Sequence, residues 1–191
     1  MKKRVVTVLV FVFVGTLLLA AAVQAQAKAA RIEGLTAYEY DCAIPQTFQP
    51  TFSGQDGHIM HIRDYVHVNV NVSESPYLAG INTTIAEAEI DTSNGRASIR
   101  GTMRLEPDAY PGSAWVGRWV FVANKSVNFG WAVAQGTGEL KGMTLFMNLY
   151  DALPAGDAKE VCETVSYNGY TGVPEDTFTT TEGYILVSGR K

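Results

Sequence analysis

The chain has 191 residues, of which 47% are hydrophobic and 18% are charged, and its formal net charge is −4. This length predicts a single domain with a substantial hydrophobic core. Beyond the first few residues the sequence contains no run rich in lysine and arginine. Such runs are the electrostatic signature of proteins that bind nucleic acid or anionic membranes, so we expect neither as a partner.

The first 27 residues have the pattern of a secretory signal peptide. Residues 2–4 are basic, and residues 5–23 are apolar apart from one glycine and two threonines. Small residues then occupy the −3 and −1 positions of two overlapping cleavage sites, after Ala25 and after Ala27. The alternative is an uncleaved membrane anchor, because the apolar run approaches the roughly 20 residues that span a bilayer.

The small-residue ending of this run favours cleavage over anchoring. We therefore predict a signal peptide over 1–27 and a mature domain over 28–191. This domain should have no stable membrane span after cleavage, and its location should be secreted or periplasmic.

Two cysteines, Cys42 and Cys162, lie near opposite ends of the predicted mature domain. An even number of cysteines in an exported protein favours a disulfide. Closing a loop of this size would stabilise the fold by about 4–5 kcal/mol in the chain-entropy model. Two buried free thiols are the alternative. A metal pair is disfavoured, because neither cysteine has a CxxC partner or a nearby histidine.

Segments of alternating polarity, rich in β-branched and aromatic residues, predict a domain that is almost entirely β. The prolines fall between these segments, as the hydrogen bonding of a sheet requires. Eight strands are expected, at about 35–42, 58–72, the two arms of 82–106, 115–123, 127–137, 140–150 and 183–189. We therefore predict a single small antiparallel β-barrel of about eight strands. The interior of such a barrel either is filled by side chains or holds one small ligand.

The segment 82–106 carries the clearest hairpin signal, Asn94-Gly95 between two alternating arms. A two-residue turn at this position places Ile90 opposite Ile99 and gathers the apolar residues on one face. The other face carries acids on one arm and arginines on its partner, which predicts a solvated outer face. These charged residues are Glu87, Glu89, Asp91, Arg96, Arg100 and Arg104.

A second hairpin is expected where Gly136-Thr137-Gly138-Glu139 and Gly142 separate two apolar runs. This Gly-Thr-Gly-x-apolar-x-Gly pattern resembles the hairpin of the allene oxide cyclase and dirigent proteins, which share a small eight-stranded β-barrel. The resemblance covers roughly twenty residues, and the matching residues are structural and not catalytic.

This resemblance also implies two kinds of activity. Allene oxide cyclases guide the cyclisation of a fatty-acid epoxide inside the barrel, and dirigent proteins orient phenolic radicals. With the basic N-terminus and the predicted signal peptide, the resemblance implies an exported bacterial member of this group.

Large apolar side chains recur on one face of several adjacent strands. Trp115, Trp119 and Phe121 share a face of one strand, and Phe129 and Trp131 share a face of the next. We predict an apolar cup walled by the three tryptophans, suited to a small apolar molecule of lipid-like, polyketide-like or aromatic type. The alternative is that the same side chains fill the core, as large apolar residues usually do.

Residues that could support catalysis are few. His58 and His61 point to opposite faces of a strand, and His61 and His67 lie roughly 20 Å apart, so we predict no metal site. Tyr65 and His67 are candidate acid–base groups. Asp64 interrupts an apolar face, which indicates either a rim or bulge position or a buried carboxylate with a raised pKa. The sequence has no nucleophile elbow, Walker loop or HExxH motif, and we expect no cofactor.

Two functions therefore stay open. The first is an exported, non-enzymatic barrel that binds a small apolar ligand or serves as a stable module. The second is a cofactor-free cyclase or isomerase of the allene oxide cyclase type, acting on a lipid-like or polyketide-like substrate. The two differ in whether an ionisable side chain faces the cavity, and we favour the first.

Overall fold

The computed structural model describes residues 30–124 and 128–188, so the predicted signal peptide lies outside the described residues. Most of these residues belong to strands, which confirms the prediction of a domain that is mainly antiparallel β. One α-helix occurs in this part of the chain, and it is the short α2 (Ala158–Cys162). No helix within the described ranges has the length and apolarity needed to cross a membrane.

Eight long strands account for most of the domain, and the remaining strands have two or three residues. The long strands are β1 (Ala30–Tyr40), β4 (Ile59–Val72), β5 (Gly80–Asp91), β6 (Arg96–Pro107), β7 (Trp115–Ala123), β8 (Asn128–Gly136), β9 (Met143–Ala152) and β13 (Phe178–Val187). The short strands are β2 (Cys42–Ala43), β3 (Thr51–Ser53), β10 (Ser166–Tyr167), β11 (Tyr170–Thr171) and β12 (Val173–Pro174).

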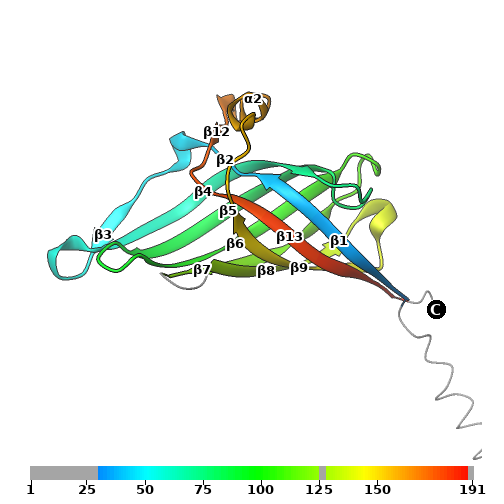
Figure 1. Cartoon of the computed structure of the whole chain (residues 1–191), viewed down its shortest axis with the longest axis horizontal. Coiled ribbons are helices and arrows are strands. Elements are labelled where there is room, and N and C mark those ends of the chain that lie inside the picture. The colour runs from blue at the N-terminus through cyan, green and yellow to red at the C-terminus, as the bar shows by residue number, and fades with distance from the viewer. Residues whose placement is uncertain (1–29, 125–127, 189–191) are drawn as a thin grey trace, which may run out of the picture.

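The long strands pair in the order β1-β13-β9-β8-β7-β6-β5-β4, all antiparallel. Strands β4 to β9 pair with their neighbours in the sequence, whereas β1 and β13 bring the two ends of the domain side by side (Figure 1). Strand β1 also pairs with β4, through Tyr38 opposite Val72 and Tyr40 opposite Val70. The order of paired strands therefore returns to its starting point.

The β5–β6 hairpin differs from its prediction in the length of its turn. Asp91 lies opposite Arg96 and Ile90 lies opposite Ala97, so residues 92–95 form the loop. The prediction of a two-residue turn with Ile90 opposite Ile99 is therefore wrong. The register moves by two residues, and because the side-chain period of a strand is two, both faces keep their predicted members.

The side chain of Asp91 accounts for this longer turn. Its carboxylate accepts hydrogen bonds from the backbone amide and the hydroxyl of Ser93, which draws the chain into a wider loop. Gly95, with φ of 72°, then donates its N–H to the Asp91 carbonyl at 2.8 Å. The charged face of this hairpin is exposed as expected, and Arg100 contacts Glu87 there at 2.9 Å.

The β8–β9 hairpin forms where the glycine pattern predicts it. Its turn contains the 3-10 helix η3 (Gly138–Leu140), and Gly138 has a φ of 59°. A Cβ atom at this position would also lie 2.5 Å from the hydroxyl oxygen of Ser113. Both the backbone angle and the close approach require glycine here.

A β-bulge divides β4 into two parts. Its register against β5 shifts between Ile62 and Tyr65, and Asp64 in the gap is exposed with a φ of 52°. The first of the two alternatives for Asp64, a rim or bulge position, is therefore confirmed.

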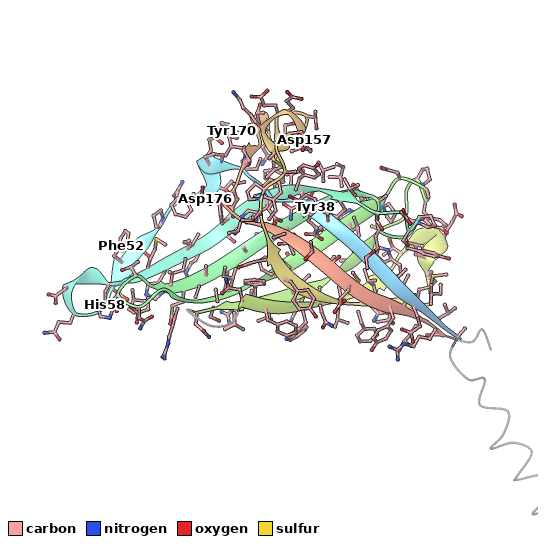
Figure 2. The ribbon with its side chains drawn as sticks, in the orientation of Figure 1. Tyr38, Phe52, His58, Asp157, Tyr170 and Asp176 are labelled. Carbon is pink, nitrogen blue, oxygen red and sulfur yellow. A yellow bond between two sulfur atoms is a disulfide. The ribbon has the colours of Figure 1, made fainter. Side chains whose placement is uncertain are left out.

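The predicted disulfide joins Cys42 to Cys162, with 5.3 Å between their Cα atoms. It ties β2 to α2, which belongs to a segment that projects from one side of the sheet (Figure 1). Tyr38 and Tyr40 fix the same segment, since they donate hydrogen bonds to the Leu153 carbonyl and the Asp157 carboxylate. Figure 2 labels Tyr38 on β1 and Asp157 in the projecting segment. A disulfide is typical of proteins that fold in an oxidising compartment.

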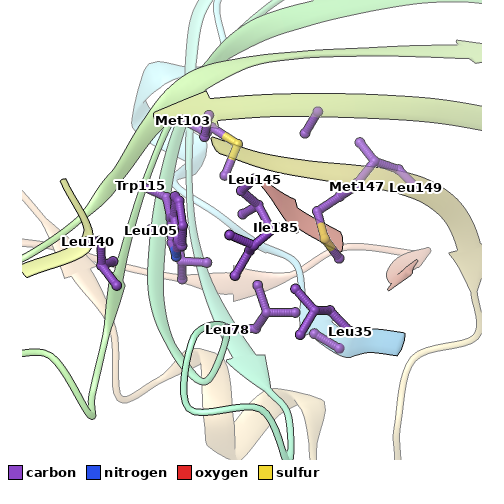
Figure 3. Close-up of a cluster of buried hydrophobic side chains, with 13 residues drawn as sticks. Leu35, Leu78, Met103, Leu105, Trp115, Leu140, Leu145, Met147, Leu149 and Ile185 are labelled. Carbon is purple, nitrogen blue, oxygen red and sulfur yellow. The ribbon is translucent and has the colours of Figure 1, made fainter. Parts of the chain in front are cut away.

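Buried apolar side chains form two separate clusters. The outer cluster lies between the sheet and the disulfide-bound segment, and it contains Cys42, Ile44, Val66, Val68, Ala158, Cys162, Val165 and Phe178. The inner cluster gathers side chains from many strands, which point toward one another in Figure 3. At its centre Trp115, Leu105, Leu145 and Ile185 are at most 1% exposed.

Candidate functional site

A cavity of about 140 Å³ continues from the inner cluster along the inner face of the sheet. One half is apolar, and its wall includes Met103, Trp119, Phe121, Leu145, Met147 and Leu149. The other half is polar, and its wall includes Glu39, Asp41, His67, Asn69, Asn71 and Glu175. Lysine and arginine are absent from the described residues that line this cavity.

The three tryptophans predicted to line a cup lie in three different environments. Trp119 lines the cavity. Trp115 is fully buried in the inner cluster, where its indole N–H donates to the Tyr77 carbonyl at 2.9 Å. Trp131 is 47% exposed and lies on the outer face.

The expectation that the aromatic face of β8 points inward is therefore wrong. The inward residues of β8 are Gly130, Ala132 and Ala134, which are small and buried. Phe121 lies opposite Gly130, and a Cβ atom at Gly130 would be 2.7 Å from the Phe121 ring. The large side chains of β7 thus occupy the interior, and β8 must present its small side chains there.

The polar half is organised around two carboxyl groups, Glu39 of β1 and Asp41 just after it. The side-chain amide of Asn71 donates to Glu39 at 2.9 Å, and that of Asn69 donates to Asp41 at 2.8 Å. Asp41 is only 8% exposed. Burial, followed by the charge of Glu39, holds the pKa of Asp41 well above its usual range. Burial also raises the pKa of Glu39, although hydrogen bonds from both asparagines oppose this shift.

A second polar group lies beside this pair. The Tyr65 hydroxyl donates to Glu175 at 2.7 Å, and the Tyr65 ring meets the edge of His67 with 4.5 Å between centroids. The His67 Nε2 atom lies 3.6 Å from the Glu175 carboxylate. Burial lowers the pKa of His67, although the charge of Glu175 opposes this shift.

Unpaired polar atoms concentrate in this cavity. Among the described residues, five buried side-chain nitrogen or oxygen atoms have no hydrogen-bond partner, and they belong to His67, Asn71, Asn82, Thr84 and Trp119. All five residues line the cavity. Asn71, Asn82 and Thr84 are each at least 95% buried, and their unpaired atoms are oxygens. Buried polar groups are almost always paired, so this concentration makes the cavity the candidate functional site.

Sequence reasoning identified Tyr65 and His67 but missed the acids around them. The alternation of β1 offered an indication of these acids. Leu35 and Ala37 are buried, and Glu39 and Asp41 follow at the next alternate positions, so they face the same side. Glu175 carried no such signal, since it reaches the cavity from an irregular segment after β12. The acids that the sequence placed on the β5–β6 hairpin lie outside this cavity.

This arrangement can bind and can exchange protons. A carboxyl group whose pKa is raised toward neutrality can donate or accept a proton from a bound molecule. Comparison of the chain with protein-family models, with curated proteins and with solved structures finds no match. Any assignment of function therefore depends on the cavity itself.

Proposed function

We propose that this chain is an exported β-barrel protein that binds a small, mainly apolar molecule inside the barrel. The observation that carries the proposal is the set of five unpaired buried polar atoms, all from residues that line one cavity. Each such atom destabilises a fold by about 1–3 kcal/mol. A ligand that hydrogen-bonds to several of them removes this cost. Export is supported by the predicted signal peptide and by the disulfide.

The size of the cavity limits the ligand. Its volume is about 140 Å³, and a protein cavity of about 150 Å³ is large enough to hold benzene. A single ring or a short branched chain therefore fits, whereas a long acyl chain does not fit as a whole. The ring would lie against Trp119 and Phe121, where aromatic contacts add to the hydrophobic gain.

Binding of 4-fluorobenzyl alcohol, followed by ¹⁹F NMR, tests this proposal. The probe should bind in the unmodified protein, and Trp119→Ala should weaken binding about 3- to 10-fold, since an aromatic pair contributes about 0.5–1.5 kcal/mol. Trp131→Ala is the matched control, because it removes an exposed indole from the outer face. Absence of binding, or equal effects of both variants, would contradict a binding site at this cavity.

A second function, a cofactor-free cyclase or isomerase, is favoured by one specific observation. Glu39 and Asp41 face the same cavity as the apolar wall, and both have a raised pKa. Such groups can move a proton within a bound molecule without metal or cofactor. Native mass spectrometry of protein from its own host should then show a bound molecule, and NMR spectra of this molecule incubated with the protein should show its conversion to an isomer. Asp41→Asn should abolish the conversion. If the bound molecule is not converted, binding is the only function that remains supported.

A further inference from the structure

The charges that face the cavity have one sign. Glu39, Asp41, Asp151 and Glu175 all contribute carboxyl groups to its wall. His67 also lines the cavity, and burial lowers its pKa, which disfavours its charged form. An anionic ligand would meet these carboxyl groups without a compensating cation, which disfavours fatty acids and other carboxylates as occupants.

The unpaired atoms complete the same pattern. Three of the five unpaired atoms are oxygens, on Asn71, Asn82 and Thr84. The Asn71 amide already donates its N–H to Glu39, so the unpaired atom of this side chain is its acceptor. Carboxylates each offer about four acceptor positions, and the asparagines occupy only some of them. The polar half therefore presents mainly hydrogen-bond acceptors.

An ammonium group carries three donors and one positive charge, and it accepts no hydrogen bond. It thus matches both the charge and the hydrogen bonding of the polar half. The apolar half begins within the same small cavity, so one molecule can contact Trp119 and Asp41 together.

We propose, building on the proposed function, that the ligand is a small amphipathic amine. Its ammonium group meets the Glu39 and Asp41 carboxylates and the Asn82 and Thr84 oxygens. Its ring or short chain lies against Trp119 and Phe121. Binding favours the ionised form of Asp41. At the same pH, the carboxyl groups of the protein therefore hold fewer protons in the complex than in the free protein.

Three probes that share one ring test this proposal by ¹⁹F NMR. They are 4-fluorobenzylamine, 4-fluorobenzyl alcohol and 4-fluorobenzoate, which are cationic, neutral and anionic at pH 7. We expect the amine to bind at least tenfold more tightly than the alcohol, and the benzoate to bind more weakly than either. An alcohol that binds as tightly as the amine overturns the amine proposal but leaves the proposed function intact. Failure of all three probes overturns both.

Substitutions at an inner and an outer acid locate the charge that the amine recognises. Asp41→Asn should reduce the affinity for the amine at least tenfold and leave that for the alcohol within about twofold. Glu87→Gln is the matched control, because it removes one negative charge from the exposed face of β5. If both variants weaken amine binding equally, the preference reflects the overall charge of the protein and not this site.

The pH dependence gives an independent readout. The groups that face Asp41 are Glu39 near the end of β1, Asp151 at the end of β9, Glu175 after β12 and His67 on β4. Burial raises the pKa of Glu39 and Asp41, so the ionised fraction of these two carboxyl groups, and with it the amine affinity, should increase from pH 5 to pH 8 while alcohol affinity stays constant. An amine affinity that does not change with pH would contradict recognition by these acids.

Discussion

The two halves of the cavity wall are built from opposite kinds of residue, and different strands supply most of each: β6, β7 and β9 the apolar half, and β1, β4 and the segment after β12 the polar half. In the inner cluster beside the apolar half, Trp115 and Ile185 are fully buried among hydrophobic side chains. In the polar half, Asp41 and Asn69 are almost equally buried, but their neighbours are carboxyl and amide groups. Burial of apolar area stabilises a fold, whereas burial of carboxyl groups destabilises it. The difference indicates that the first half holds the domain together and that the second contributes little to stability, which agrees with the proposed binding role.

The largest effect is expected in the apolar half. Trp115→Ala should lower the free energy of unfolding by about 3–5 kcal/mol, because it leaves a large cavity and removes the hydrogen bond to Tyr77. Urea unfolding measures this loss. Trp131→Ala, on the outer face, should lower it by about 1 kcal/mol or less. Equal losses at the two positions would contradict the assignment of Trp115 to the core.

An intermediate effect is expected where the disulfide-bound segment joins the sheet. Replacement of both Cys42 and Cys162 by alanine should lower the free energy of unfolding by about 2–5 kcal/mol. This segment carries Glu175, so its loosening should affect the polar half more than the apolar half. Hydrogen exchange should therefore accelerate more for amides near residues 158–175 than for those of β7 and β8. Uniform acceleration throughout the domain would contradict this view.

The smallest change in the free energy of unfolding is expected for Asp41→Asn, and this change is an increase. Its pKa in the fold lies above the ordinary value of 3.8, so the folded state binds more protons than the unfolded state between these two pKa values. The free energy of unfolding should thus fall as pH rises from 3.8 through the raised pKa. Asp41→Asn removes this decline, leaving only the part due to Glu39.

At pH 7 the Asp41→Asn variant should accordingly unfold a few degrees higher than the unmodified protein. Thermal unfolding at pH 4 and pH 7 measures both the gain and its dependence on pH. If the variant is less stable than the unmodified protein at pH 7, the carboxylate of Asp41 stabilises the free protein. This result would contradict the view that the buried carboxyl groups of the polar half destabilise the fold.

The sequence was sufficient for those features that depend on local pattern or on composition. The strands, the glycine turn of β8–β9, the outer charged face of β5–β6 and the disulfide were all predicted, because each depends on residues close in sequence or on a cysteine count. The turn of β5–β6 was not, since the Asp91 side chain competes with the two-residue turn that Asn94-Gly95 favours.

The inner and outer faces were harder to predict, for a physical reason. Alternation divides a strand into two faces, but it does not say which face is enclosed. On β4 the valines pack outward against the disulfide-bound segment, and Asn69 and Asn71 face the cavity. On β8 the large aromatic residues face outward, because β7 fills the space inside. The first assignment depends on a segment that is distant in the sequence, and the second depends on how the side chains of two paired strands share the interior.

The pairing of β1 with β13 has a consequence for how the protein folds. Ala30 lies opposite Val187, so the last long strand of the domain must be present before the first has its full set of partners. Contacts between residues this far apart give a high contact order, and all-β domains of this kind fold in milliseconds to seconds. Glu39 and Asp41 lie at the end of this first strand and in the residue after it. The polar half of the cavity is therefore completed only when nearly the whole domain is available to fold.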